Sequence, residues 1–238
     1  MAVSRRRMLR MAGGVTAGVA TLGAAGFVWL RRWLDPQTPL DYAFPATSGL
    51  GAMLAPTRAC ADDDTEGQVE GPFYTPKTPL RTNLRSAATA GIPLIIEGRV
   101  LTTDCRPVMG AVLDVWSCDG NGVYDNDGYN LRGHQFTDAH GAFRIETVKP
   151  ADYRQFGVHR TPHVHVKVQG RETALLTTQL YFPGEALNMQ DSIFSESLLM
   201  KVEPAADGSR RASFDFVLAP RDTAQLSLNV RLKRSWHG

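Results

Sequence analysis

Two histidines separated by one residue are the feature of this chain most able to do chemistry. His163 and His165 lie in the run HVHVKV at residues 163–168, whose alternation is typical of a β-strand. Successive side chains of a strand point to opposite faces, so both imidazoles face one side and the valines face the other. Two imidazoles about 7 Å apart at their Cα atoms can bind one metal ion. The valine face can pack into a core.

Two tyrosines extend this pair to a candidate ligand set. Tyr124 follows a glycine-rich turn, and Tyr153 lies ten residues before His163. A phenol is a poor ligand at neutral pH because its pKa is about 10, but a bound trivalent cation lowers that pKa sharply. Two anionic oxygens with two imidazoles favour Fe(III) over Fe(II) and over zinc. The ferrous triad would need a carboxylate, and the sequence has no His-x-Asp or His-x-Glu pair.

Other interpretations of the same residues remain open at this point. A tyrosine after a turn commonly serves packing, and Tyr129 competes with Tyr124 for the ligand role. A zinc or copper enzyme would use His163 and His165 with a third histidine, for which His134 and His159 are the candidates. An exported β-sandwich that only binds a partner would need none of these side chains to meet.

The composition restricts the class of protein. With 238 residues and a net charge of +2, the chain is long enough for a sizeable core, and its basic residues gather near the two ends. No part of the body combines a basic patch with interleaved aromatics, so we expect no nucleic-acid partner. The three cysteines form no CxxC pair. Cys105 and Cys118 are able to form a disulfide in an exported protein, with Cys60 left over, and buried free thiols are equally compatible.

The N-terminus predicts export. Twin arginines within residues 4–10 precede a mildly apolar, Gly/Ala-rich run over residues 11–30, which is typical of a Tat signal. The alternative is a membrane anchor with positive flanks, and an uncleaved segment would tether the protein to the membrane. We therefore expect a signal or anchor at residues 1–34, a linker or surface arm at 35–65, and one catalytic domain at 66–238, located outside the cytoplasm.

The body of the chain reads as short strands separated by turns. Expected strands cover residues 94–101, 111–116, 141–148, 163–168, 180–182, 211–218 and 226–232, and one turn of helix is expected within 185–194. No long amphipathic helix is predicted after residue 90. This pattern predicts an all-β sandwich.

Several ordered motifs resemble the intradiol ring-cleavage dioxygenases, the family that includes the protocatechuate and catechol dioxygenases. The matching segments span residues 70–74, 114–124, 131–141, 149–153, 160–165 and 178–182. The Arg-x-x-His-x-His element at 160–165 is the most specific of them. Ala151 stands where the family commonly has glycine. The chain lacks room for the helical N-terminal domain of the catechol type and is similar to the single-domain, Tat-exported members.

This resemblance implies a fold, a cofactor and a reaction. The fold would be an immunoglobulin-like β-sandwich, and one Fe(III) per chain would be bound by Tyr124, Tyr153, His163 and His165. The substrates would be a small catechol-type diol and O2. The ring would be cleaved between its two hydroxyl-bearing carbons, which gives a muconate-type diacid. A homo-oligomer is compatible with the resemblance.

The resemblance also implies roles for single residues. Tyr124 would remain on the iron, whereas Tyr153 would dissociate when substrate binds. Arg160 would stabilise developing negative charge, and Gln179 would orient the substrate. The pocket wall is less defined, and its candidates are Phe73, Tyr74, Tyr129 and Phe156.

Overall fold

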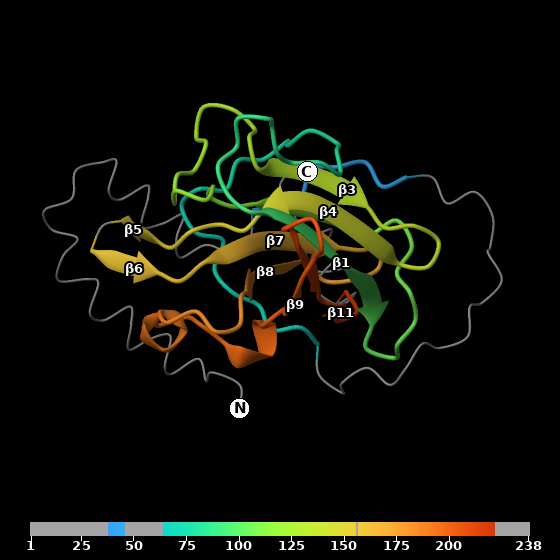
Figure 1. Ribbon diagram of the computed structural model, residues 1–238. Helices are drawn as coiled ribbons and strands as arrows, with labels where there is room; N and C mark the ends of the chain where they lie inside the picture. Colours follow the sequence, from blue (N-terminus) through green and yellow to red (C-terminus); the bar gives the residue numbers. More distant parts are fainter. Residues whose placement is uncertain (1–37, 46–63, 156, 222–238) are drawn as a thin grey trace, which may run out of the picture.

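The computed structural model describes residues 38–45, 64–155 and 157–221 (Figure 1). The expected signal or anchor at 1–34, most of the expected linker, and the expected strand at 226–232 lie outside these residues. The regular elements of the described part are almost all β-strands, as expected. Among the described residues, no helix is long and apolar enough to cross a membrane.

Two sheets and one hairpin make up the described fold. One sheet has the order β11-β1-β10-β9, with β4 pairing β1; the other has the order β3-β2-β7-β8, and β5 pairs β6 in a hairpin. The strands are β1 (Pro93–Thr102), β2 (Val112–Trp116), β3 (Arg132–Phe136), β4 (Ala142–Val148), β5 (Tyr153–Gln155), β6 (Val158–Arg160), β7 (His163–Gln169), β8 (Leu176–Tyr181), β9 (Lys201–Pro204), β10 (Arg210–Ser213) and β11 (Phe216–Leu218). Two 3-10 turns are present, η2 (Asn188–Gln190) and η3 (Glu196–Leu198).

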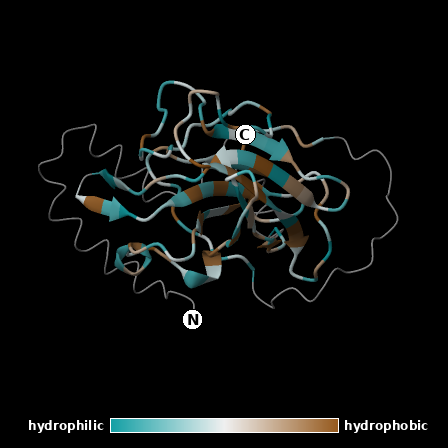
Figure 2. Ribbon diagram, in the orientation of Figure 1, coloured by the Kyte–Doolittle hydropathy of each residue, from teal (hydrophilic) through white to brown (hydrophobic). Residues whose placement is uncertain are grey.

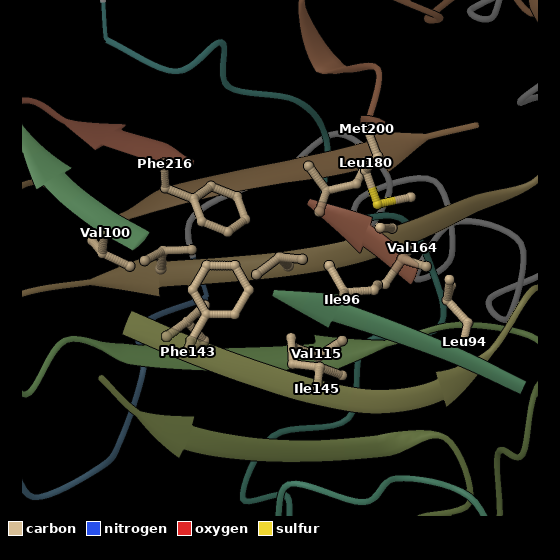
Figure 3. Packing of buried hydrophobic residues seen from close by; sticks show 14 of the residues in the cluster. Leu94, Ile96, Val100, Val115, Phe143, Ile145, Val164, Leu180, Met200 and Phe216 are labelled. Atoms are coloured by element: carbon tan, nitrogen blue, oxygen red, sulfur yellow. The ribbon is translucent and has the colours of Figure 1, made fainter. Parts of the chain in front are cut away.

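The hydrophobic core lies between the two sheets. Val164, Val166 and Val168 of β7 are completely buried there, in one cluster with side chains of β1 and β4 such as Ile96 and Phe143. Figure 3 shows Val164, Ile96 and Phe143 in this cluster, and Figure 2 shows the hydrophobic residues that recur along the strands. Each such aliphatic side chain contributes about 1.5–3 kcal/mol to stability by its burial. The predicted valine face of residues 163–168 is therefore confirmed, and it fixes the two histidines on the opposite face.

That opposite face of the second sheet carries buried charges. Lys167 of β7 forms an ion pair of 2.6 Å with Glu70, and both side chains are fully buried. The same ammonium donates to the carbonyl of Thr38, and Asp114 of β2 accepts a hydrogen bond from the Tyr42 hydroxyl at 2.8 Å. Residues 38–45 thus lie as an arm against this sheet.

The single strand expected at 211–218 is divided in two. Strand β10 pairs with the first half of β1 and β11 with the second half in the same register, and residues 214 and 215 interrupt the pairing between them. At the interruption the Asp215 carboxylate accepts the Arg99 N–H at 2.8 Å, in place of a backbone carbonyl. Gly98 is required there because a Cβ would collide with the backbone of Phe214. Alternation alone does not reveal such an interruption.

The cysteines do not pair as the sequence allowed. Cys118 is a buried free thiol, and its sulfur lies 3.4 Å from the carbonyl oxygen of Ala151. Cys105 is disulfide-bonded. The disulfide between Cys105 and Cys118 that the sequence permitted is therefore absent, because Cys118 is enclosed among aromatic side chains beneath the site.

Candidate metal centre

Four side chains from separate elements meet at one end of the second sheet. His163 and His165 lie at the start of β7, Tyr153 begins β5, and Tyr124 lies in the loop after β2. The ring centroids are 4.7 Å apart between the two histidines, 5.6 Å from His163 to Tyr153, 5.4 Å from Tyr153 to Tyr124, and 6.5 Å from Tyr124 to His165. Each ring lies next to two others of the four, so the structure brings together all four predicted ligands.

Hydrogen bonding fixes which nitrogen of His163 is able to bind a metal. Its Nδ1 lies 2.6 Å from the carbonyl oxygen of Thr161, which only accepts, so Nδ1 carries the proton and Nε2 holds the lone pair. That Nε2 lies 3.1 Å from Nε2 of His165. Two nitrogens at this separation suit neighbouring positions around one ion, because metal–imidazole bonds are about 2.1 Å long.

Burial sets the protonation of the four groups. It lowers the pKa of His163 and of His165 well below the ordinary value, so both imidazoles are neutral at pH 7. Burial likewise raises the pKa of Tyr124 and of Tyr153, although the Arg160 guanidinium opposes the rise at Tyr153. Both tyrosines are therefore neutral phenols until a cation displaces their protons.

One buried polar atom of the cluster supports a metal site. Among the described residues, the Tyr124 hydroxyl has no hydrogen-bond partner at proper geometry, although Tyr153 is close enough to influence the pKa of Tyr124. Buried polar atoms are rarely left unpaired. A donor set of two phenols and two imidazoles, without carboxylate or thiolate, fits Fe(III).

The third histidine that zinc or copper would need is not supplied by the candidates. His134 stacks on Tyr42 at 3.9 Å, and its Nδ1 lies 2.7 Å from the carbonyl of Thr78. His159 lies 2.6 Å from the Asp152 carboxylate on the hairpin. In the part of the chain that the structure describes, no group of three His, Cys, Asp or Glu side chains is able to hold a metal.

Arg160 and Gln179 lie beside the ligands and contact each other. Arg160 is buried at the end of β6, and its Nη2 donates to Oε1 of Gln179 at 2.6 Å. In the strand registers Arg160 is opposite Tyr153, and Gln179 of β8 is opposite His165. Directly opposite residues of antiparallel strands project on the same side, which explains why the two predicted catalytic residues reach the site.

Sequence reasoning missed two residues that hold His165 in place. Trp116, opposite His165 in the register of β2 and β7, stacks on its ring at 4.8 Å with an interplanar angle of 7°. Gly71 has a φ of +76°, and a Cβ there would lie 3.3 Å from Cε1 of His165. The glycine thus allows the backbone to approach the imidazole. Trp116 could have been found only from the pairing of β2 with β7, because that register places it opposite His165.

The candidates for the pocket wall have different locations. Phe73 stacks on Tyr124 at 4.2 Å and belongs to the site. Tyr74 is buried beneath it, packs on Trp116 and donates to Asp114, so it is not a wall residue. Tyr129, the competing ligand, is 40% exposed. Phe156 lies outside the described residues.

Comparisons with known proteins agree with this geometry. A family model described as Dioxygenase matches residues 69–220. Hydroxyquinol 1,2-dioxygenase of Corynebacterium glutamicum is 30% identical over 72% of this chain and 70% of its own length. The enzyme of the same name from Rhodococcus opacus is 32% identical over 70% of this chain and 68% of its own.

A solved structure is also similar to this chain. The dioxygenase domain of a dioxygenase and carbohydrate-binding protein fusion from the cellulolytic Streptomyces sp. SirexAA-E is 45% identical. The superposition covers 66% of this chain and 99% of that domain, with a TM-score of 0.60. The chain belongs to the intradiol ring-cleavage dioxygenase family, and its fold is the β-sandwich of that family. The resemblance read from the motifs is confirmed.

Proposed function

We propose that this dioxygenase binds one Fe(III) per chain through two tyrosines and two histidines, Tyr124, Tyr153, His163 and His165. Membership of the family makes the chain an oxidoreductase that incorporates both atoms of O2. It cleaves a catechol-type ring between the two hydroxyl-bearing carbons and gives a muconate-type diacid. The meeting of two buried imidazole nitrogens with two phenols is the observation that supports this site.

A ferric ion in this site supplies Lewis acidity and a template for the diol. The two tyrosines then have different tasks. Tyr124 is enclosed by Phe73 and we propose that it stays a ligand. Tyr153 lies on the short β5–β6 hairpin, which Figure 1 shows projecting from one end of the sandwich. We propose that Tyr153 would hold the ion as a phenolate before the diol binds, and that its oxygen would then accept one of the diol protons.

Arg160 supplies the fixed positive charge of the site. It is buried next to Tyr153, and its guanidinium is held by Gln179 and by Asp191. A buried, oriented guanidinium stabilises negative charge that develops on a bound ring far better than a solvated one. We propose that Arg160 performs this task, and that Gln179 orients both the arginine and the substrate.

The visible spectrum of the iron-loaded protein tests the ligand set. We expect a broad tyrosinate-to-Fe(III) band that moves to longer wavelength when catechol is added without O2. Tyr153→Phe should keep iron but change the band and slow turnover, whereas His163→Ala should lose iron. Tyr129→Phe, an exposed tyrosine nearby, is the matched control and should leave the band unchanged. If Tyr153→Phe left both spectrum and rate unchanged, the ligand assignment would be wrong.

For the substrate we propose a catechol or hydroxyquinol ring without a carboxylate. Relatives are named as acting on hydroxyquinol and on chlorocatechol. In this chain the Nε and Nη2 groups of Arg160 already donate to Asp191 at 2.8 Å and to Gln179 at 2.6 Å, so fewer of its N–H groups are left to bind a carboxylate on the ring. We expect kcat/KM to be lowest for a carboxylated catechol. A carboxylated catechol cleaved faster than catechol would contradict this proposal.

We also propose that the protein works outside the cytoplasm. The support is the sequence of residues 1–34, with twin arginines before an apolar run, which lies outside the described residues. Replacing Arg6 and Arg7 with lysine should leave the protein in the cytoplasm of the native host. Unchanged export of that variant would contradict the Tat proposal.

A further inference from the structure

We propose that Asp191 is a positioning residue that sets the orientation of Arg160 for ring cleavage. This inference rests on the proposed function. Asp191 lies just after η2, in the segment that connects β8 to β9, and it belongs to none of the motifs that identified the family. Its side chain is 1% exposed and that of Arg160 is 5% exposed, so the two form a buried ion pair.

The contacts of Asp191 join the hairpin to the body of the protein. Its Oδ2 accepts from Nε of Arg160 at 2.8 Å and from the N–H of Thr161 at 3.1 Å. Its Oδ1 accepts from the N–H of Ile193 at 3.2 Å. The carboxylate therefore has partners on the hairpin side and on its own segment, and it links the two.

Further hydrogen bonds strengthen the link between the hairpin and this segment. The Thr161 hydroxyl donates to Oδ1 of Asn188 at 2.7 Å, and the Asn188 amide donates to the carbonyl of Phe182 at 2.9 Å. The peptide that follows Arg160 is thus held from both its backbone and its side chain. The arginine side chain takes its direction from Asp191 and Gln179.

Different nitrogens of the Arg160 guanidinium donate to two acceptors. Asp191 holds the Nε side, and Gln179 holds Nη2 at 2.6 Å. Planar recognition by a guanidinium depends on such directed contacts, and a buried cation without a counter-charge is strongly unfavourable. Loss of the Asp191 carboxylate should therefore turn the guanidinium away from the ring. The metal ligands, which Asp191 does not contact through its side chain, should remain in place.

The test is Asp191→Asn in the iron-loaded enzyme with catechol as substrate. We expect kcat to fall by about 10- to 100-fold, the usual effect of removing a residue that supports a functional side chain. Iron content, the tyrosinate-to-iron band and anaerobic catechol affinity should change little. A general structural role would instead move the band or lower the iron content, and that result would overturn the proposal.

A double-variant cycle shows whether Asp191 acts through Arg160. In an Arg160→Gln background, adding Asp191→Asn should cause no further loss of kcat, because the group that it positions is gone. The same further loss as in the wild-type background would overturn the proposal. Asp114→Asn is the matched control: a buried carboxylate that accepts from Tyr42, Tyr74 and Thr78 and should leave kcat unchanged.

Asp191→Glu keeps the test decisive if the asparagine variant does not fold. This variant keeps the negative charge but displaces the carboxylate, so kcat should fall while catechol affinity is retained. An unchanged kcat would overturn the proposal. Failure of the proposed function is distinguishable, because then the wild-type protein itself would show no tyrosinate-to-iron band and no ring cleavage.

Discussion

At the scale of single residues, the site depends on groups whose protonation is set by burial. His163 presents a lone pair because the Thr161 carbonyl holds its other nitrogen in the protonated state. Tyr124 and Tyr153 are kept as neutral phenols because burial raises their pKa. The metal-free site is therefore uncharged at its four ligands. A cation must displace two protons from it, so binding is linked to pH.

This linkage predicts how iron affinity depends on pH. Each phenol releases a proton when it becomes a ligand, so affinity should rise about 100-fold per pH unit below the ordinary tyrosine pKa. The sign follows because protons compete with the metal for the phenol oxygens. Competition with a chelator of known affinity, between pH 6 and pH 8 at about 25 °C, measures the slope.

Tyr153→Phe provides the control for this slope. Only one phenol then remains, so the rise should be about tenfold per pH unit. An affinity that does not depend on pH in the wild-type protein would mean that the tyrosines are not ligands.

At the scale of elements, the site is made where three structures meet. Strand β7 supplies both histidines, the β5–β6 hairpin supplies Tyr153 and Arg160, and the loop after β2 supplies Tyr124. The arm at residues 38–45 covers the sheet next to them, and it is tied down by Tyr42 and by the carbonyl of Thr38. The arm is therefore part of the folded unit.

The arm makes a prediction about stability. Tyr42→Phe removes the hydroxyl that contacts Asp114 at 2.8 Å and Thr78 at 2.9 Å. We expect the free energy of unfolding to fall by about 1–3 kcal/mol, since a hydrogen bond to a buried carboxyl is lost. Urea unfolding of the metal-free protein measures it. Tyr129→Phe, which removes an exposed hydroxyl, should change stability by less than about 0.5 kcal/mol. Equal effects of the two variants would show that the arm does not contribute.

At the scale of the whole molecule, the sequence predicted what depends on local periodicity. The alternation at 163–168 predicted both the buried valines and the shared face of His163 and His165, because a strand has a strict period of two. It did not predict Trp116, Gly71 or Asp191. Their contacts join segments far apart in the chain, and periodicity does not mark them, although Gly71 and Trp116 lie within the motifs at 70–74 and 114–124. The break between β10 and β11 was missed for the same reason.

The most direct test of the account is the product formed from catechol and ¹⁸O2 by the iron-loaded protein. An intradiol dioxygenase adds both oxygen atoms at the cleaved bond, so mass spectrometry should show a muconate diacid that carries both labelled atoms. His163→Ala should lose this product together with the visible band, whereas Tyr153→Phe should still form it, more slowly. A semialdehyde product, which forms when the ring opens beside the diol rather than within it, would contradict the account. So would a protein that binds iron and catechol and consumes no O2.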